Sequence, residues 1–255
     1  MRTLSTKHLL ILAGVVLVTF SQASNLFAQK NAPGLASQKA PAGDSVSPQL
    51  TCEQVVAELV THNQERAGAL RGYTGRRVYT LDYRGFPGSR SAELVVEARY
   101  SAPGTKSFTI VSQTGSKLLL DRVLKRLLTT EEEAQTAANR QKTALTPQNY
   151  RFELVDETTT DQGNFYVLKV EPRSTNKLLY RGKVWVDAKD FAVARIDAEP
   201  AVNPSFWISH TSIEEQYAKF GLFWLPVRNE SVTKVRFGGT ATLVIQYEDY
   251  NLEND

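Results

Sequence analysis

Residues Leu178–Trp207 read LLYRGKVWVDAKDFAVARIDAEPAVNPSFW, and two apolar runs in this stretch flank a short polar segment. The runs are Leu179–Val186 and Phe191–Ala198, and both are rich in β-branched and aromatic residues. The polar tetrad Asp187–Asp190 separates them. This pattern predicts a β-hairpin with a short loop.

Side-chain alternation gives this hairpin two faces. Successive strand residues point to opposite sides, so Val184 and Val186 share an apolar face and Lys183 lies on the other. On the second strand, Ala194 and Ile196 form the apolar side. The hairpin is therefore predicted to have one dry face and one wet face.

The same period of two recurs before and after the hairpin. Tyr79, Leu81 and Tyr83 share one face, and Ala92–Tyr100 alternates apolar with charged residues. Further strands are predicted at Phe108–Ser112, Tyr150–Asp156, Phe165–Glu171, Ile208–Tyr217, Phe220–Val227, Glu230–Phe237 and Ala241–Tyr247. We expect one α+β domain in which about ten strands form a large antiparallel sheet curved around its helices.

Two segments show helical periodicity instead. One helix is predicted over about 51–70, with Thr51 and Gln54 as a capping box. The second segment, 118–128, carries Leu120 and Leu124 within a leucine-rich stripe. A new polar helix is then predicted to begin at Thr130, with Glu133 in the capping-box position, and to run to about Lys142. The acidic run 131–133 fits such a helix start through the helix dipole.

The N-terminus has the order of a secretory signal peptide. Arg2 and Lys7 precede an apolar run, Leu9–Phe20, which is too short for a membrane span. Residues 1–28 are predicted to be a cleaved signal peptide, 29–50 a flexible linker and 51–255 the folded domain. Because no cysteine follows the apolar run directly, we expect an exported periplasmic protein that is not lipid-anchored.

Charge and motif content argue against several functions. The formal net charge of +3 falls to +1 once Arg2 and Lys7 are removed with the signal peptide, which gives no support for a nucleic-acid partner. One cysteine and scattered histidines predict no metal site and no cofactor. No catalytic residue is predicted. Carboxylates such as Asp197 and Glu199 are explained by turns and solvated strands, so a hydrolase is the weakest hypothesis.

Three segments carry a family resemblance. They are Arg181–Trp207, Tyr217–Pro226 (YAKFGLFWLP) and Gly238–Tyr250 (GGTATLVIQYEDY). This pattern resembles bacterial exported proteins described as outer-membrane lipoprotein-sorting proteins, in the LolA/LolB superfamily, over most of residues 51–252. The resemblance implies an unclosed antiparallel β-barrel, with helices plugging an apolar cavity that holds acyl chains.

The resemblance also suggests which residues would serve a carrier of lipid or lipoprotein acyl chains. The apolar cavity would be lined by Leu94, Val96, Val184, Val186 and Ile196. The lid or plug helices would contribute Val56, Leu59, Val60, Leu120 and Leu124. Inner- or outer-membrane proteins would then be its partners. Two alternatives stay open: the same residues can form a dry core, and the chain can be an RseB-like module that senses lipoproteins or stress.

Overall fold

A computed structural model describes residues 50–253 except 136, 204–205, 207 and 237. The predicted signal peptide lies outside the described residues, and so does the predicted linker apart from Leu50. Among the described helices, none combines the length and apolar character needed to cross a membrane.

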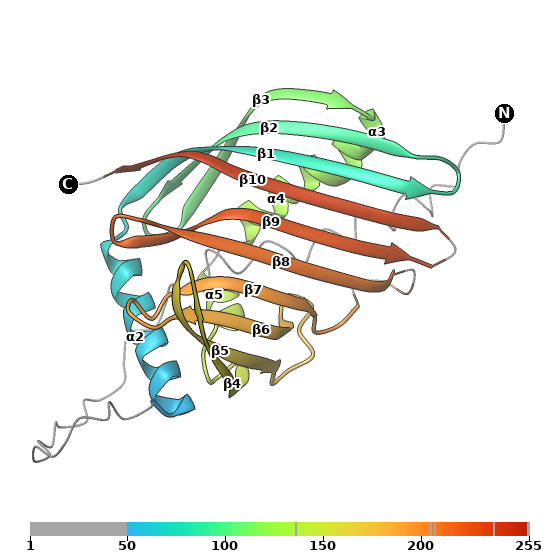
Figure 1. Cartoon of the computed structure of the whole chain (residues 1–255). Coiled ribbons are helices and arrows are strands. Elements are labelled where there is room, and N and C mark those ends of the chain that lie inside the picture. The colour runs from blue at the N-terminus through green and yellow to red at the C-terminus, as the bar shows by residue number, and fades with distance from the viewer. Residues whose placement is uncertain (1–49, 136, 204–205, 207, 237, 254–255) are drawn as a thin grey trace, which may run out of the picture.

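All ten strands belong to one antiparallel sheet, in the order β3-β2-β1-β10-β9-β8-β7-β6-β5-β4 (Figure 1). The strands are β1 (Gly72–Gly85), β2 (Arg90–Ser101), β3 (Thr105–Gly115), β4 (Tyr150–Thr160), β5 (Gly163–Pro172), β6 (Tyr180–Asp187), β7 (Val193–Pro200), β8 (Ile208–Phe220), β9 (Phe223–Val235) and β10 (Gly239–Glu253). Because β3 and β4 remain at opposite edges, the curved sheet is not closed. The predicted fold class is therefore confirmed.

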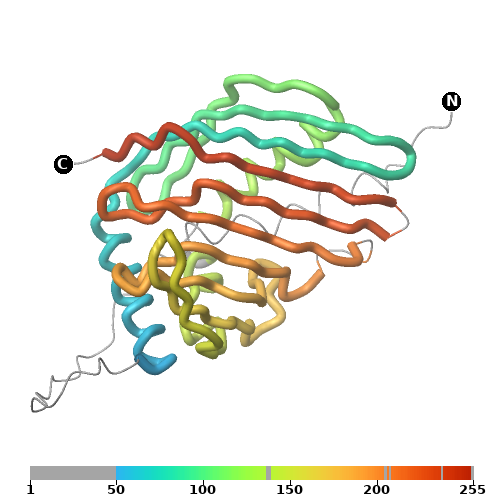
Figure 2. The backbone as a smooth tube through the Cα atoms, in the orientation of Figure 1, coloured from blue at the N-terminus to red at the C-terminus, as the bar shows by residue number. Residues whose placement is uncertain are grey.

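The first and last strands of the chain meet in the middle of one half of the sheet. Strand β1 pairs with β10 from Gly72↔Glu253 to Gly85↔Gly239. Figure 2 shows these two segments, teal and red, running side by side. Strands β1–β3 thus pair with one another first along the chain, and β10 is the strand that joins them to the rest of the sheet.

The central hairpin forms as predicted, with one correction. Val184 and Val186 are fully buried. A β-bulge places Val193 opposite Val186, so Val193 rather than Ala194 enters the core beside Ile196. An extra residue at a bulge shifts the alternation by one position. The runs predicted as separate strands around Val227 and Glu230 are likewise one continuous strand, β9.

Helix α2 spans Cys52–Ala69, and both hydrogen bonds of its capping box are formed. The second helical segment consists of α3 (Lys117–Leu119), a π-helical turn η1 (Leu120–Leu124) and α4 (Lys125–Ala134), followed by α5 (Ala137–Thr143). The helix start predicted at Thr130 is wrong. Its hydroxyl donates to the carbonyl of Arg126 inside α4, because the leucine stripe continues the helix through this point.

Two large apolar clusters lie on the inner face of the sheet, which is the face that the helices cover, and a smaller third cluster forms around Leu70, Tyr73 and Tyr100. The first cluster lies on β1, β2 and β10 and is covered by the segment 117–128. The second cluster joins α2 to strands β4–β7. Strands β8 and β9 lie between these two groups in the sheet order and carry the residues that position the candidate site.

Candidate functional site

A band of buried polar side chains separates the two apolar clusters. It occupies the inner positions of β8 and β9, where alternation would place apolar residues in a simple core. We call these residues the polar strip: Thr211 and Glu215 on β8, and Asn229, Ser231 and Thr233 on β9. All five side chains are buried.

An ion cluster of Arg77, Lys106 and Glu131 lies at one side of this strip. Glu131 on α4 accepts hydrogen bonds from Arg77 Nη1 at 2.8 Å and from Lys106 Nζ at 2.6 Å. Arg77 comes from β1 and Lys106 from β3, so the cluster ties the helix to two strands. The Arg77 guanidinium also lies over the rings of Phe108 and Tyr247, at 5.2 and 4.8 Å from their centroids.

The charges of this cluster stabilise each other. Burial alone would raise the pKa of Glu131, but the adjacent positive charges of Arg77 and Lys106 and their hydrogen bonds hold it below its usual value. Burial would similarly lower the pKa of Arg77, and the charge of Glu131 raises it instead. Glu131 and Arg77 therefore both stay ionised at neutral pH.

Glu215 behaves differently because the effect of its burial exceeds that of its favourable interactions. Burial and the negative charge of Glu131 raise the pKa of Glu215 to about 7, against the opposing effect of hydrogen bonds with Tyr217 and Asn229. Asn229 lies directly across from Glu215 in the β8–β9 register. The strip thus holds a carboxyl group that changes its charge near neutral pH.

The residues predicted for an apolar cavity are divided between the two clusters. Leu94 and Val96 meet the helix residues Leu120 and Leu124 in the first cluster. The second cluster contains Val184, Val186 and Ile196 together with Val56 and Leu59, and Val60 packs against it. The residues predicted to line one cavity therefore lie in two separate clusters. The first cluster is covered by the segment 117–128 and the second by α2.

A groove of about 500 Å³ opens beside α2 and the start of β4. Helix α2 contributes Val56 and Val60, and the other wall includes Tyr150 and Phe152. Cys52 also lines the groove, and burial is the main cause that raises the pKa of its thiol. The groove is therefore bordered by two of the residues predicted for the lid.

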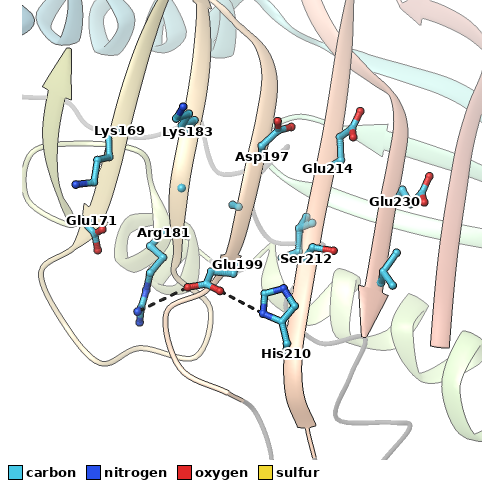
Figure 3. Close-up of a pocket in the computed structure, with 14 residues that line it drawn as sticks. Lys169, Glu171, Arg181, Lys183, Asp197, Glu199, His210, Ser212, Glu214 and Glu230 are labelled. Carbon is cyan, nitrogen blue, oxygen red and sulfur yellow. Dashed lines mark ion pairs between the residues drawn. The ribbon is translucent and has the colours of Figure 1, made fainter. Parts of the chain in front are cut away.

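The outer face of the sheet carries a second groove, of about 590 Å³, over β5–β9 (Figure 3). Its charged side chains cross neighbouring strands in register, with Lys169 opposite Lys183 and then Asp197 opposite Glu214. Figure 3 shows Glu199 between Arg181 and His210, at 3.9 and 3.5 Å from them. Within the described residues, no group of three or more metal-ligating side chains occurs, here or elsewhere.

The predictions missed the polar strip and the ion cluster, although the sequence contains a signal for them. Arg77 lies two residues before Tyr79 on the same face of β1, and Glu215 lies between Ile213 and Tyr217 on the inner face of β8. A charged residue at an inward position of an otherwise apolar alternation indicates a buried polar site. Glu131 was instead explained by a helix start, and its burial shows that this was wrong.

No family model and no curated protein sequence matches this chain. Solved structures similar to it include a DUF1329 family protein from Desulfovibrio piger, with 12% identity, a TM-score of 0.42, and coverage of 79% of this chain and 93% of that one. An outer membrane lipoprotein-sorting protein domain from Vibrio parahaemolyticus has 11% identity, a TM-score of 0.42, and coverage of 76% and 92%.

A LolA superfamily protein from Nitrosomonas europaea has 8% identity, a TM-score of 0.36, and coverage of 81% and 96%. The superfamily named by the sequence resemblance is thus among the similar structures.

Proposed function

We propose that this chain is an exported, periplasmic binding protein that carries an acyl chain of a lipid or lipoprotein without covalent chemistry. The groove beside α2 is the observation that supports this most directly. Its volume of about 500 Å³ falls in the range of small-molecule sites, and Val56, Val60 and Phe152 give it an apolar lining. It also borders the second apolar cluster, which could continue the site inwards.

We propose the first apolar cluster as the place of a further acyl chain, with the segment 117–134 as its lid. Its five stripe residues, Leu120, Val123, Leu124, Leu127 and Leu128, are all buried against the sheet. Burying five such side chains contributes ~10 kcal/mol, and burying about a dozen methylenes of an acyl chain contributes a similar ~10 kcal/mol. An acyl chain could therefore replace this cover at little net cost. The π-helical turn at Leu120–Leu124 supports the proposal, since such turns are frequent at functional sites.

Titration with a fluorescent fatty-acyl probe tests the function. Saturable binding is expected, together with a higher melting temperature in the presence of the probe. Val60→Trp should fill the groove and weaken binding, while Glu65→Trp, on an exposed position of the same helix, should not. Hydrogen exchange should show lower protection of the 117–134 amides when the probe is bound. Absence of saturable binding to the wild type would contradict the proposal.

A protein-interaction role, as in an RseB-like sensing module, is the second candidate. The outer groove supports it, because Asp197, Glu214 and Glu230 are direct neighbours on three adjacent strands. Arg195 is paired with Asp197 and Glu214, and Arg228 is paired with Glu230, so a basic partner segment would compete with these exposed arginines for the carboxylates. A membrane or lipoprotein partner that binds in the absence of lipid, and is lost on Glu214→Gln, would favour this candidate.

A further inference from the structure

Three buried polar side chains, one in the polar strip and two outside it, have no hydrogen-bond partner within the described part of the chain. They are Ser231 through its hydroxyl, Tyr180 through its phenol oxygen, and Gln135 through both ends of its amide. Their exposed fractions are 1%, 4% and 6%. An unsatisfied buried polar group costs roughly 1–3 kcal/mol, so several of them in one region indicate groups that a ligand completes.

Ser231 shares the inner face of the sheet with Glu215, and Tyr180 interacts with Glu215 electrostatically. Ser231 is the next inward residue after Asn229 on β9, and Asn229 lies across from Glu215. The electrostatic interaction of Tyr180 with Glu215 links it to the same site from strand β6. Gln135 follows Glu131 by one helical turn, and both side chains are buried.

Tyr180 also connects this region to the groove beside α2. Its ring lies 5.4 Å from that of Tyr150, and Tyr150 forms part of the groove wall. An apolar groove and a polar, buried region are thus neighbours, separated by one pair of aromatic rings. This arrangement matches an amphiphile with its chain in the groove and its polar end at the strip.

The charges indicate an uncharged polar end. Arg77 and Lys106 are already hydrogen-bonded to Glu131, and Glu215 is bonded by Tyr217 and Asn229. An anionic headgroup would meet Glu215 and Glu131, and a cationic one would meet the excess of Arg77 and Lys106. The unpartnered groups are hydroxyls and an amide, which donate and accept hydrogen bonds without charge.

We propose that the polar strip binds the uncharged, hydroxyl- and ester-bearing glycerol group of an acylglycerol whose acyl chain lies in the groove beside α2. This inference rests on the proposed acyl-chain binding and adds the headgroup class. Ser231, Tyr180 and Gln135 supply hydrogen bonds to the glycerol oxygens. The strip therefore selects among lipids that share the same chain.

Three probes with the same saturated chain test the headgroup: palmitoylglycerol, palmitate and hexadecylamine, each titrated into the full-length protein. Palmitoylglycerol is expected to bind most tightly. Ser231→Ala and Tyr180→Phe should each weaken its binding by roughly five- to tenfold, the loss of one hydrogen bond, and leave palmitate binding unchanged. Without ligand, both variants should melt at the same or a higher temperature, because each removes an unsatisfied buried hydroxyl.

Thr211→Val is the matched control, because the Thr211 and Thr233 hydroxyls bond each other at 2.9 Å. It should lower the melting temperature and show no selective loss for palmitoylglycerol. Equal affinities for all three probes would overturn the headgroup assignment and leave acyl-chain binding standing. A fall in ligand-free melting temperature for Ser231→Ala and Tyr180→Phe, as in Thr211→Val, would assign them a structural role and also overturn it. Failure of all three probes to bind would overturn both proposals.

Discussion

Glu215 makes the stability of this protein depend on pH near neutrality. Its folded-state pKa of about 7 lies above the value of 4.5 for an ordinary glutamate, so the folded protein holds this proton more tightly than the unfolded chain. The stabilising effect of the proton is complete below the unfolded pKa and is lost as the pH rises through the folded pKa. The contribution of Glu215 to the free energy of unfolding therefore decreases as the pH rises. The contribution of Glu131 increases instead, because its lowered pKa favours the folded state above about pH 4.5.

We predict that Glu215→Gln flattens this dependence. In the wild type, the contribution of Glu215 to the free energy of unfolding should decrease by about 3 kcal/mol between about pH 5 and pH 8. Glutamine has no charge to bury, so the variant should lack this decrease. Urea denaturation across the pH range measures both curves, and their difference isolates Glu215. Parallel curves would show that Glu215 is not the titrating group.

Glu131 neutralises two buried cations, so its loss should be costly. Glu131→Gln leaves Arg77 and Lys106 buried beside an uncharged amide, and we expect a loss of about 3–5 kcal/mol in the free energy of unfolding. Asp121→Asn on the neighbouring turn is the control, because the Asp121–Lys125 pair is exposed to solvent. Its denaturation midpoint should not change. Similar losses for the two variants would mean that the buried cluster contributes no more than a surface pair.

At the scale of the element, the central hairpin has one face that tolerates charge and one that does not. Val184→Asp places a carboxylate among fully buried side chains and should cost several kcal/mol. Lys169→Asp places the same group on the exposed face, between Lys183 and Glu153, and should cost about 1 kcal/mol because only an exposed ion pair is lost. Thermal or urea melts compare the two variants. Equal losses would show that the assignment of the faces is wrong.

The sequence was sufficient to predict this hairpin, and the reason is physical. A period of two over several residues constrains which face is buried, so Tyr79, Leu81 and Tyr83 were placed correctly. The same rule failed where a bulge shifts the alternation, because the bulge that brings Val193 into the core has no local signature in the sequence. The alternation rule also cannot predict which residues of distant elements come into contact.

The candidate site was less predictable than the sheet because it depends on contacts between distant elements. Arg77, Lys106 and Glu131 come from two strands and a helix, and only the folded sheet brings them together. A helix start at Thr130 was predicted from four residues, whereas the leucine stripe that decides the helix extends well beyond them. Local patterns therefore predict elements, and long-range pairing determines the site.

At the scale of the whole molecule, the sheet has one weak joint. Strands β7 and β8 are aligned only over Arg195–Ala198 and Ile213–Gln216, whereas β8 and β9 pair from Ile208 to Phe220. The joint lies next to the polar strip, and the second apolar cluster crosses it through Tyr217 on β8. Strands β4–β7 with α2 thus form a unit that is coupled loosely to the rest.

We predict that this unit opens separately from strands β8–β10 and β1–β3. Native-state hydrogen exchange at increasing denaturant should show the amides of β4–β7 losing protection together, at a different free energy from those of β1 and β10. The measurement resolves the two groups by strand. One common opening free energy for all core amides would show instead that the sheet unfolds as a single cooperative unit.

The pairing of β1 with β10 imposes an order on folding. Strands β1–β3 are made early, yet β1 has its second partner only when Gly239–Glu253 is available, and Tyr79 then pairs with Ile245. Closing so long a loop lowers the entropy of the chain before the stabilising contacts form, and this slows folding. Until that moment, one edge of β1 exposes unpaired amides that can recruit another chain. We therefore expect the pairing of β10 with β1 to be a late step of folding, and the one that protects this edge of β1.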